Sequence, residues 1–154
     1  MQDYISRQLA EAQSIVSAMQ ADTALQANLA RTAEACIACL RAGGKLLFAG
    51  NGGSAADAQH MAGEFVSRFA FDRPGLAAVA LTVDTSILTA IGNDYGYEKL
   101  FSRQVQALGR AGDVLVAYST SGRSPNVLRA LETAREQGLV TVGFTGNQIG
   151  RAHV

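Results

Sequence analysis

Tryptophan is absent from this chain, and among its 154 residues only two are proline and two are cysteine. Two cysteines are too few for the disulfide framework that staples small secreted domains. Lysine and arginine number thirteen, as do aspartate and glutamate, so charge of neither sign is in excess. The chain therefore has no net field that would recruit nucleic acid or an anionic membrane, and it has no local basic patch.

The sequence also lacks an apolar run of membrane-spanning length. Its first residues, Met-Gln-Asp-Tyr-Ile-Ser-Arg, do not have the basic start, apolar centre and cleavage site of a secretory signal peptide. We therefore expect a cytoplasmic protein. Its length and its hydrophobic fraction of 48% are typical of one globular domain with a substantial core.

The two cysteines, Cys36 and Cys39, have the C-x-x-C spacing of redox and zinc motifs. They lie within a helical pattern, and no second pair of cysteines or histidines is nearby. We favour the interpretation that both thiols pack as small apolar side chains.

Helical and strand-like patterns alternate along most of the chain. Apolar residues three and four apart predict one helix over residues 2–20 and a second from an N-cap at Asp22 to about Leu40, before Gly43 and Gly44. Short apolar segments followed by turn residues predict strands at 46–49, 77–81, 114–118 and 140–144. The helices between them are predicted at 54–70, at 86–108 with a break at 92–94, and at 124–137.

This alternation indicates β-α-β units, and hence an α/β, doubly wound fold whose parallel sheet is covered on both faces. We expect residues 1–154 to form a single domain, in which a helical hairpin over residues 1–43 precedes an α/β core over residues 44–150.

In open parallel sheets, ligands bind beyond the carboxyl ends of the strands. The turn Gly50-Asn-Gly-Gly-Ser54 follows the first strand, and its glycines have no Cβ to keep a ligand from the backbone N–H groups. It matches neither the dinucleotide fingerprint nor the phosphate loop of ATPases. From the glycines alone, a tight turn without a ligand is the favoured interpretation.

The turn after the third strand, Ser119-Thr-Ser-Gly-Arg-Ser124, contains four hydroxyl side chains. Pro125 follows it, which predicts a helix start with Ser124 as N-cap, and a helix N-terminus favours an anion. Hydroxyl and amide donors suit a phosphate ester, so we favour phosphate binding over a hydroxyl-rich cap alone.

His60 and Glu64 are four residues apart on a predicted helix and therefore share one face. Such a pair could bind a metal or perform acid–base chemistry. On the spacing alone, an ordinary surface or capping pair is the favoured interpretation. Asn93 and Asp94, in the predicted helix break, could bind a polyol or form an Asx turn.

Together, Gly-Asn-Gly-Gly-Ser, His-x-x-x-Glu, Thr-Ala-Ile-Gly-Asn-Asp-Tyr-Gly and Ser-Thr-Ser-Gly-x-Ser resemble the sugar isomerase (SIS) family, over a stretch that reaches about Gly146. The resemblance implies a three-layer α/β/α sandwich of flavodoxin-like type. It also implies a homotetramer with sites between subunits, and an isomerase that interconverts a ketose phosphate and an aldose phosphate through an enediol. The expected pair is sedoheptulose 7-phosphate and D-glycero-D-manno-heptose 7-phosphate, in heptose synthesis for the lipopolysaccharide core.

The resemblance also assigns residues to roles. His60 and Glu64 match two zinc ligands, and Glu64 matches a residue that contacts the substrate and acts as the catalytic acid/base. The other residues matched to the sugar phosphate are Asn51, Gly52, Gly53, Asn93, Asp94, Ser119, Thr120, Ser121 and Ser124, of which the last four match the loop that holds the phosphate.

The sequence departs from the family at its end, Asn147-Gln-Ile-Gly-Arg-Ala-His-Val154. Family members continue through another strand and a long helix, which supplies a Gln and a His as further zinc ligands and the second acid/base group. His153 lies outside that motif and is not assigned a role. We therefore expect a truncated chain, less stable than a full-length relative and weak or inactive as an isomerase.

A non-catalytic SIS protein is the competing hypothesis, either a sugar-phosphate sensor or an adaptor that binds the replication initiator DnaA. Both His60 and Glu64 are present beside a complete hydroxyl loop, and this favours the enzyme.

Overall fold

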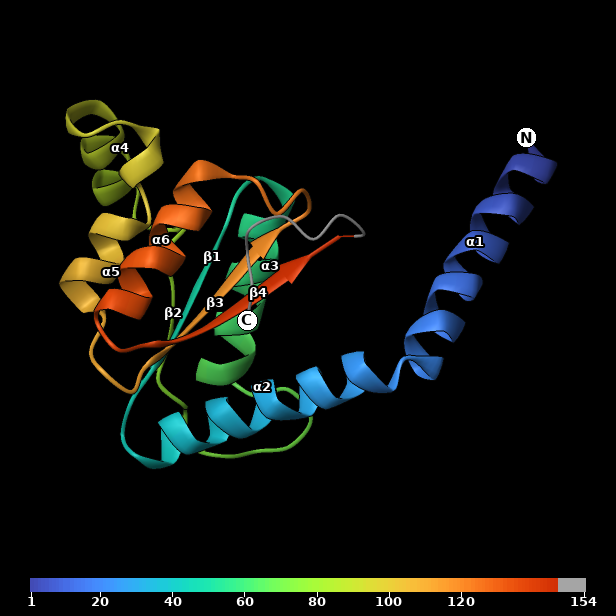
Figure 1. Ribbon diagram of the computed structural model, residues 1–154, viewed down its shortest axis with the longest axis horizontal. Helices are drawn as coiled ribbons and strands as arrows, with labels where there is room; N and C mark the ends of the chain where they lie inside the picture. Colours follow the sequence, from blue (N-terminus) through green and yellow to red (C-terminus); the bar gives the residue numbers. More distant parts are fainter. Residues whose placement is uncertain (147–154) are drawn as a thin grey trace. The chain divides into compact units, whose positions relative to one another are not determined.

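The computed structural model describes residues 1–146 and shows a parallel sheet of four strands in that part of the chain, with helices on both faces (Figure 1). The elements in chain order are α1 (Gln2–Ala21), α2 (Thr23–Arg41), β1 (Leu46–Gly50), α3 (Gly53–Val66), β2 (Ala78–Ala80), α4 (Thr85–Asp94), the 3-10 helix η1 (Tyr97–Lys99), α5 (Ser102–Leu108), β3 (Val114–Ser119), α6 (Pro125–Glu136) and β4 (Val140–Thr145). The α/β fold expected from the alternating pattern is confirmed.

The chain forms two compact units, Met1–Glu34 and the remainder from Ala35. In the first unit, the side chain of Asp22 accepts a hydrogen bond from the Leu25 backbone N–H at 2.9 Å, which confirms it as the N-cap of α2. None of the residues of α1 is buried. The hairpin arrangement of the two helices remains a prediction. Every candidate site residue belongs to the second unit.

The strands of the sheet are ordered β2-β1-β3-β4, and each pair of neighbours is parallel. Every residue of β1 is buried, which requires helices on both faces of the sheet. In the register of the central pair, Leu46 lies opposite Val114, and Gly50 lies opposite Tyr118. The carboxyl ends of β1 and β3, and the turns that follow them, are therefore neighbours.

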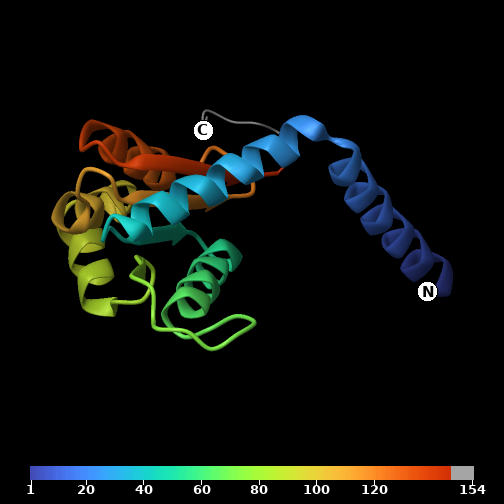
Figure 2. The same cartoon turned by 90° about the horizontal axis from the view of Figure 1, so that it is seen from below.

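Alternate residues of the strands enter two separate apolar cores. Leu47 and Ala49 pack with buried residues of α5 and α6, whereas Leu46 and Phe48 pack with Ala58 and other residues from the opposite face. Both ribbon views show α3 and α6 on opposite sides of the strands (Figures 1 and 2). The molecule therefore has the three layers, helix, sheet and helix, that the resemblance implies.

The helix α3 ends at Val66, four residues before the predicted end. The guanidinium of Arg73 donates hydrogen bonds to the backbone oxygens of Glu64 and Phe65, both at 2.8 Å. The Leu76 N–H also donates to Phe65 O, at 3.0 Å. The chain after α3 thus folds back and satisfies the carbonyls that a longer helix would have used.

The predicted break at residues 92–94 is wrong in position. Gly92, Asn93 and Asp94 all belong to α4, which ends at Asp94. The break comes at Gly96, whose φ of +84° is a conformation that side-chain-bearing residues rarely adopt. The chain then continues through η1 into α5.

A buried carboxylate ties the first residues of β1 and β3 together. Asp113 accepts hydrogen bonds from the backbone N–H groups of Lys45 and Arg110, each at 2.9 Å, and from Lys45 Nζ. Burial by itself would raise the pKa of Asp113, but these hydrogen bonds and the Lys45 charge lower it below its ordinary value.

Both cysteines are free thiols on α2. Cys39 is buried in the core with Phe48, and its Sγ lies 3.4 Å from Lys45 O, whereas Cys36 is partly buried. Burial raises the pKa of both thiols, with the neighbouring cysteine adding to the effect at Cys36 and Asp113 at Cys39. A raised pKa disfavours the reactive thiolate, in agreement with packing as apolar side chains.

Candidate functional site

The turn between β1 and α3 depends on its glycines. A Cβ on Gly50 would lie 2.6 Å from the backbone oxygen of Ser54, closer than real Cβ contacts allow. Gly52 has a φ of +57° and is the N-cap of α3. Asn51 and Gly53 complete the turn, at the carboxyl end of the central strand.

The hydroxyl loop, residues 119–124, follows the neighbouring strand β3. Ser119 is buried, and its Oγ lies 3.1 Å from Ser124 Oγ. Ser121 Oγ accepts the Arg123 N–H at 3.2 Å, while the Gly122 N–H donates to Ser119 O at 3.0 Å. The loop leads directly into α6, whose first residue is Pro125, as predicted. The structure thus gathers hydroxyl groups at a helix N-terminus, an arrangement suited to an anion.

Thr120 belongs to the same loop, and its backbone contacts the residue that follows β4, Gly146. Its backbone oxygen accepts the Gly146 N–H at 3.1 Å. A Cβ on Gly146 would lie 2.8 Å from that oxygen, so the close approach requires glycine here.

An amide pair joins the glycine turn to α6. Asn51 Nδ2 donates to Asn126 Oδ1, and Asn126 Nδ2 donates to Asn51 Oδ1, both at 2.8 Å. Tyr97 from η1 donates its hydroxyl to Asn51 Oδ1 at 3.2 Å. A pocket of about 300 Å³ lies here, and its lining includes Asn51, Tyr97, Ser124 and Asn126.

The sequence interpretation missed Asn126 and Tyr97. Asn126 is only 2% exposed, on the face of α6 that also buries Ala130 and Ala134. A polar residue four and eight positions from buried alanines was a usable signal, because a buried amide needs a hydrogen-bonding partner. The exposed Tyr97 offered no such signal.

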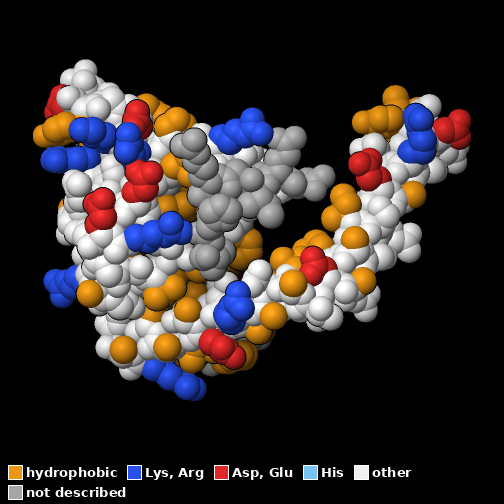
Figure 3. Space-filling view, viewed as in Figure 1, with side chains coloured by type: hydrophobic (Ala, Val, Ile, Leu, Met, Phe, Trp, Pro, Cys, Tyr) orange, Lys and Arg blue, Asp and Glu red, His pale blue; other side chains and the backbone are white. Residues whose placement is uncertain are grey.

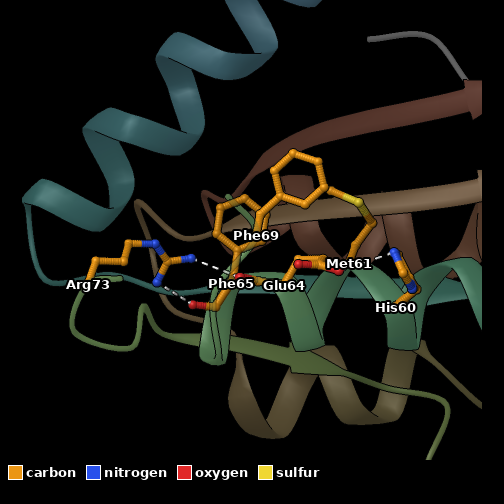
Figure 4. A pocket seen from close by; sticks show the side chains of 6 residues that line it. All are labelled: His60, Met61, Glu64, Phe65, Phe69 and Arg73. Carbon is orange, nitrogen blue, oxygen red and sulfur yellow. Dashed lines mark hydrogen bonds and ion pairs between the residues drawn. The ribbon is translucent and has the colours of Figure 1, made fainter. Parts of the chain in front are cut away.

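His60 and Glu64 lie side by side on α3, with His60 Nε2 3.4 Å from Glu64 Oε1 (Figure 4). The side chain of His60 is 71% exposed, and that of Glu64 is 27% exposed. Both line an open, mainly apolar pocket of about 270 Å³ together with Met61, Phe65, Phe69 and Arg73. Arg73 reaches the last turn of α3, so it also holds the backbone of Glu64 in place.

The donor set of this pair fits half of a zinc site. A neutral imidazole nitrogen and a carboxylate oxygen are both normal zinc ligands, but zinc ordinarily takes four ligands. In the part of the chain that the structure describes, no group of three or more His, Cys, Asp and Glu side chains could hold a metal ion.

The structure separates the candidate residues rather than gathering all of them in one cavity. The pocket at Asn51 and the pocket at Glu64 share no lining residue. The α-helical rise of ~1.5 Å per residue puts Glu64 on the order of 16 Å along α3 from the glycine turn. The exposed Asn93 donates to the Asp94 carboxylate at 2.8 Å, and neither residue lines either pocket.

Tyr118, one residue before the hydroxyl loop, has a strongly altered pKa. Burial, with smaller contributions from Asp57 and Cys36, raises the pKa of Tyr118 to about 12. Its ring stacks on Phe144, with centroids 5.4 Å apart. This phenol stays protonated at neutral pH, so it is not a general base.

The sequence matches one family of known proteins. The SIS domain family profile matches residues 9–146. The phosphoheptose isomerase of Burkholderia pseudomallei is 69% identical over 147 residues, which are 96% of this chain and 75% of that protein. The phosphoheptose isomerase of a Bradyrhizobium strain is 59% identical, over 92% of this chain and 72% of that protein.

Solved structures agree with the sequence matches. The phosphoheptose isomerase GmhA from Neisseria gonorrhoeae superposes with a TM-score of 0.86 at 49% identity, over 97% of this chain and 77% of that one. A phosphoheptose isomerase from Francisella tularensis also gives 0.86, at 37% identity, over 98% of this chain and 79% of that one.

Proposed function

Since this chain belongs to the SIS domain family, we propose that it is an isomerase that interconverts sedoheptulose 7-phosphate and D-glycero-D-manno-heptose 7-phosphate. The observation that carries the proposal is the pairing of two turns on neighbouring strands, one rich in glycine and one rich in hydroxyls. Relatives named phosphoheptose isomerase, up to 69% identical, support the same substrate.

The phosphate is assigned to the hydroxyl loop. Ser119, Ser121 and Ser124 supply hydroxyl donors, and Thr120 lies between them in the same turn. The first N–H groups of α6 add a positive partial charge. A monoester phosphate is therefore held by neutral donors. Asn51, Gly52 and Gly53 in the facing turn, together with Asn93 and Asp94, are assigned to the sugar.

Glu64 is assigned as the acid/base that moves the carbon-bound proton. Its carboxylate would accept a proton from C1 of the ketose, giving an enediol, and the carboxylic acid would return a proton to C2 to give the aldose. A second proton must move between O1 and O2 in the same step sequence. The position of Glu64 in an open pocket, with its backbone held by Arg73, is compatible with this role.

We also assign His60 and Glu64 as two zinc ligands, on the chemistry of their donor atoms and their 3.4 Å separation. When bound, zinc would polarise the sugar oxygens and stabilise the charge that develops on them. The zinc content of the purified protein, measured by elemental analysis, tests this assignment.

A homotetramer with sites shared between subunits is part of the proposal. The pockets at Asn51 and Glu64 are separate in one chain, so a second subunit is a natural source of the groups that each one lacks. Large apolar side chains on α1, including Ile5, Leu9 and Val16, are also exposed. Figure 3 shows hydrophobic side chains along the surface of this helix. Exposed apolar stripes of this kind promote association. Light scattering on the purified protein would give its mass in solution.

The proposed setting is the cytoplasm, where the product would enter heptose synthesis for the lipopolysaccharide core. Among residues 1–146, no helix combines the length and the hydropathy needed to cross a lipid bilayer.

The experiment that tests the proposed function combines binding with turnover. Sedoheptulose 7-phosphate is titrated calorimetrically, and its conversion is followed by ¹³C NMR. We expect saturable binding and at least weak conversion to an aldose phosphate. Binding without any conversion would instead support a sugar-phosphate sensor, and the absence of binding would contradict both functions.

A further inference from the structure

The carboxamide of Asn51 is held more tightly than its position in a glycine-rich turn requires. It exchanges two hydrogen bonds of 2.8 Å with Asn126 and accepts a third, of 3.2 Å, from Tyr97 Oη. Asn126 is buried in the first turn of α6, so the side chain that grips Asn51 is itself fixed by the protein interior.

These bonds use up most of the hydrogen-bonding capacity of Asn51. A carboxamide oxygen accepts two hydrogen bonds, and the nitrogen donates two. Asn126 and Tyr97 together satisfy the oxygen, and Asn126 takes one hydrogen of the nitrogen. Only one N–H remains for a ligand, and the residue lines the pocket beside Ser124.

Tyr97 is also supported from the surface. The next residue, Glu98, pairs with Arg129 of α6, with Arg129 Nε 2.8 Å from Glu98 Oε1. Arg129 in turn pairs with Glu132 at 3.1 Å. The exposed ion pairs add little energy individually, but they connect η1 to the helix that carries Asn126.

We propose that Asn126 is a positioning residue which, with Tyr97, fixes the Asn51 carboxamide so that its one free N–H donates to a hydroxyl or carbonyl oxygen of the bound sugar. This inference rests on the proposed function for the identity of the ligand. The amide pair joins the turn that meets the sugar to the helix that follows the phosphate loop, so it sets the sugar relative to the phosphate.

The test compares two ligands on one variant, Asn126→Ala. The dissociation constants of sedoheptulose 7-phosphate and of inorganic phosphate are measured for the wild type and the variant. We expect sugar-phosphate binding to weaken about tenfold, as the loss of one oriented hydrogen bond implies. Phosphate binding is expected to change less than about twofold, because its donors come from the hydroxyl loop. Tyr97→Phe is expected to weaken sugar-phosphate binding by about twofold to fivefold, since its hydroxyl bond is exposed.

Gln104→Ala is the matched control. Gln104 is another buried amide, and its Nε2 donates to the backbone oxygens of Leu81 and Leu100, but it lines neither pocket. This variant is expected to lower stability without changing the ratio of the two dissociation constants. Equal weakening of both ligands in Asn126→Ala, or no weakening of either, would overturn the proposal.

NMR spectroscopy of the protein without ligand tests the hydrogen bonds between Asn51 and Asn126 independently of the substrate. In the wild type, the two Asn51 Nδ2 protons are expected to have well-separated NMR shifts and slow exchange with solvent, and in Asn126→Ala both features are expected to be lost. Unchanged Asn51 resonances in the variant would refute the positioning role. If the features are lost in Asn126→Ala but the wild type does not bind sedoheptulose 7-phosphate, the result would support the amide pair and contradict only the proposed substrate.

Discussion

Single residues in the glycine turn differ sharply in how much they are constrained. Gly50 packs against the Ser54 backbone so closely that no side chain fits, whereas a Cβ on Gly53 would meet nothing within 4 Å. Gly53 is also the first residue of α3 and has no positive φ. Packing against Ser54 therefore requires glycine at position 50, whereas neither packing nor backbone conformation requires it at position 53.

Substitution of each glycine by alanine should therefore change the stability of the protein differently. Gly50→Ala is expected to lower the free energy of unfolding by about 1–3 kcal/mol, because the added Cβ overlaps backbone atoms that cannot move aside cheaply. Gly53→Ala is expected to leave stability unchanged or to raise it by up to about 1 kcal/mol, since alanine is the better helix former. Urea denaturation of both variants checks this, and equal stabilities would show that the turn relaxes around the new side chain.

Residue types with local roles were predictable from the sequence, and residues with distant partners were not. Asp22 as an N-cap and Pro125 as a helix start depend only on neighbours in the chain. Asn126 bonds to Asn51, 75 positions away, so its importance emerges only once β1 and β3 are paired. Arg73 is a different case, because its partners, Phe65 and Glu64, lie only eight and nine positions earlier in the chain.

At the scale of elements, the two central strands begin at one buried ion pair. Asp113, before β3, bonds to the backbone and the side chain of Lys45, before β1. The folded protein lowers the pKa of Asp113, so ionisation of this group favours the folded state. Its contribution is present above the ordinary carboxyl pKa of about 4 and is lost as the pH falls through the lower value of the folded state.

Asp113→Asn is expected to destabilise the protein by about 1–3 kcal/mol at pH 7, because the amide loses charge-assisted hydrogen bonds in a buried position. The difference between the wild type and the variant should shrink as the pH falls below about 4, where Asp113 takes up a proton first in the unfolded chain and, at lower pH, in the folded protein. Urea denaturation at pH 7 and at pH 3 measures both quantities. A difference that stays constant over this range would show that Asp113 ionisation does not contribute to stability.

Element boundaries were less predictable than element types. Local composition predicted α3 to residue 70 and one interrupted helix over residues 86–108. Instead, α3 ends at Val66, where hydrogen bonds from Arg73 satisfy the carbonyls of its last turn. The break at Gly96 was misplaced because three residues with turn propensity, Gly92, Asn93 and Asp94, fit within α4. At the end of α3, hydrogen bonds from a later segment therefore outweigh intrinsic helix preference.

At the scale of the whole molecule, the sequence predicted a covered parallel sheet, because the strands are apolar on both faces. The candidate residues of the two turns, and His60 and Glu64, lie where predicted, at the ends of β1 and β3 and on α3. Asn93 and Asp94 do not, because they belong to α4 rather than to a helix break. The division of the candidate residues between two pockets could not be predicted from the sequence, because it depends on the length of α3 and on its path along the sheet. On the face shown in Figure 3, acidic and basic side chains are interspersed.

We propose that Glu64 moves a proton on a sugar phosphate held by the hydroxyl loop. Turnover and the dissociation constant of sedoheptulose 7-phosphate, measured side by side for the wild type and Glu64→Gln, test it most directly. We expect the variant to bind within about threefold of the wild type but to lose at least about a hundredfold in turnover, the scale of general acid–base catalysis. Wild-type turnover in the Gln variant would contradict it.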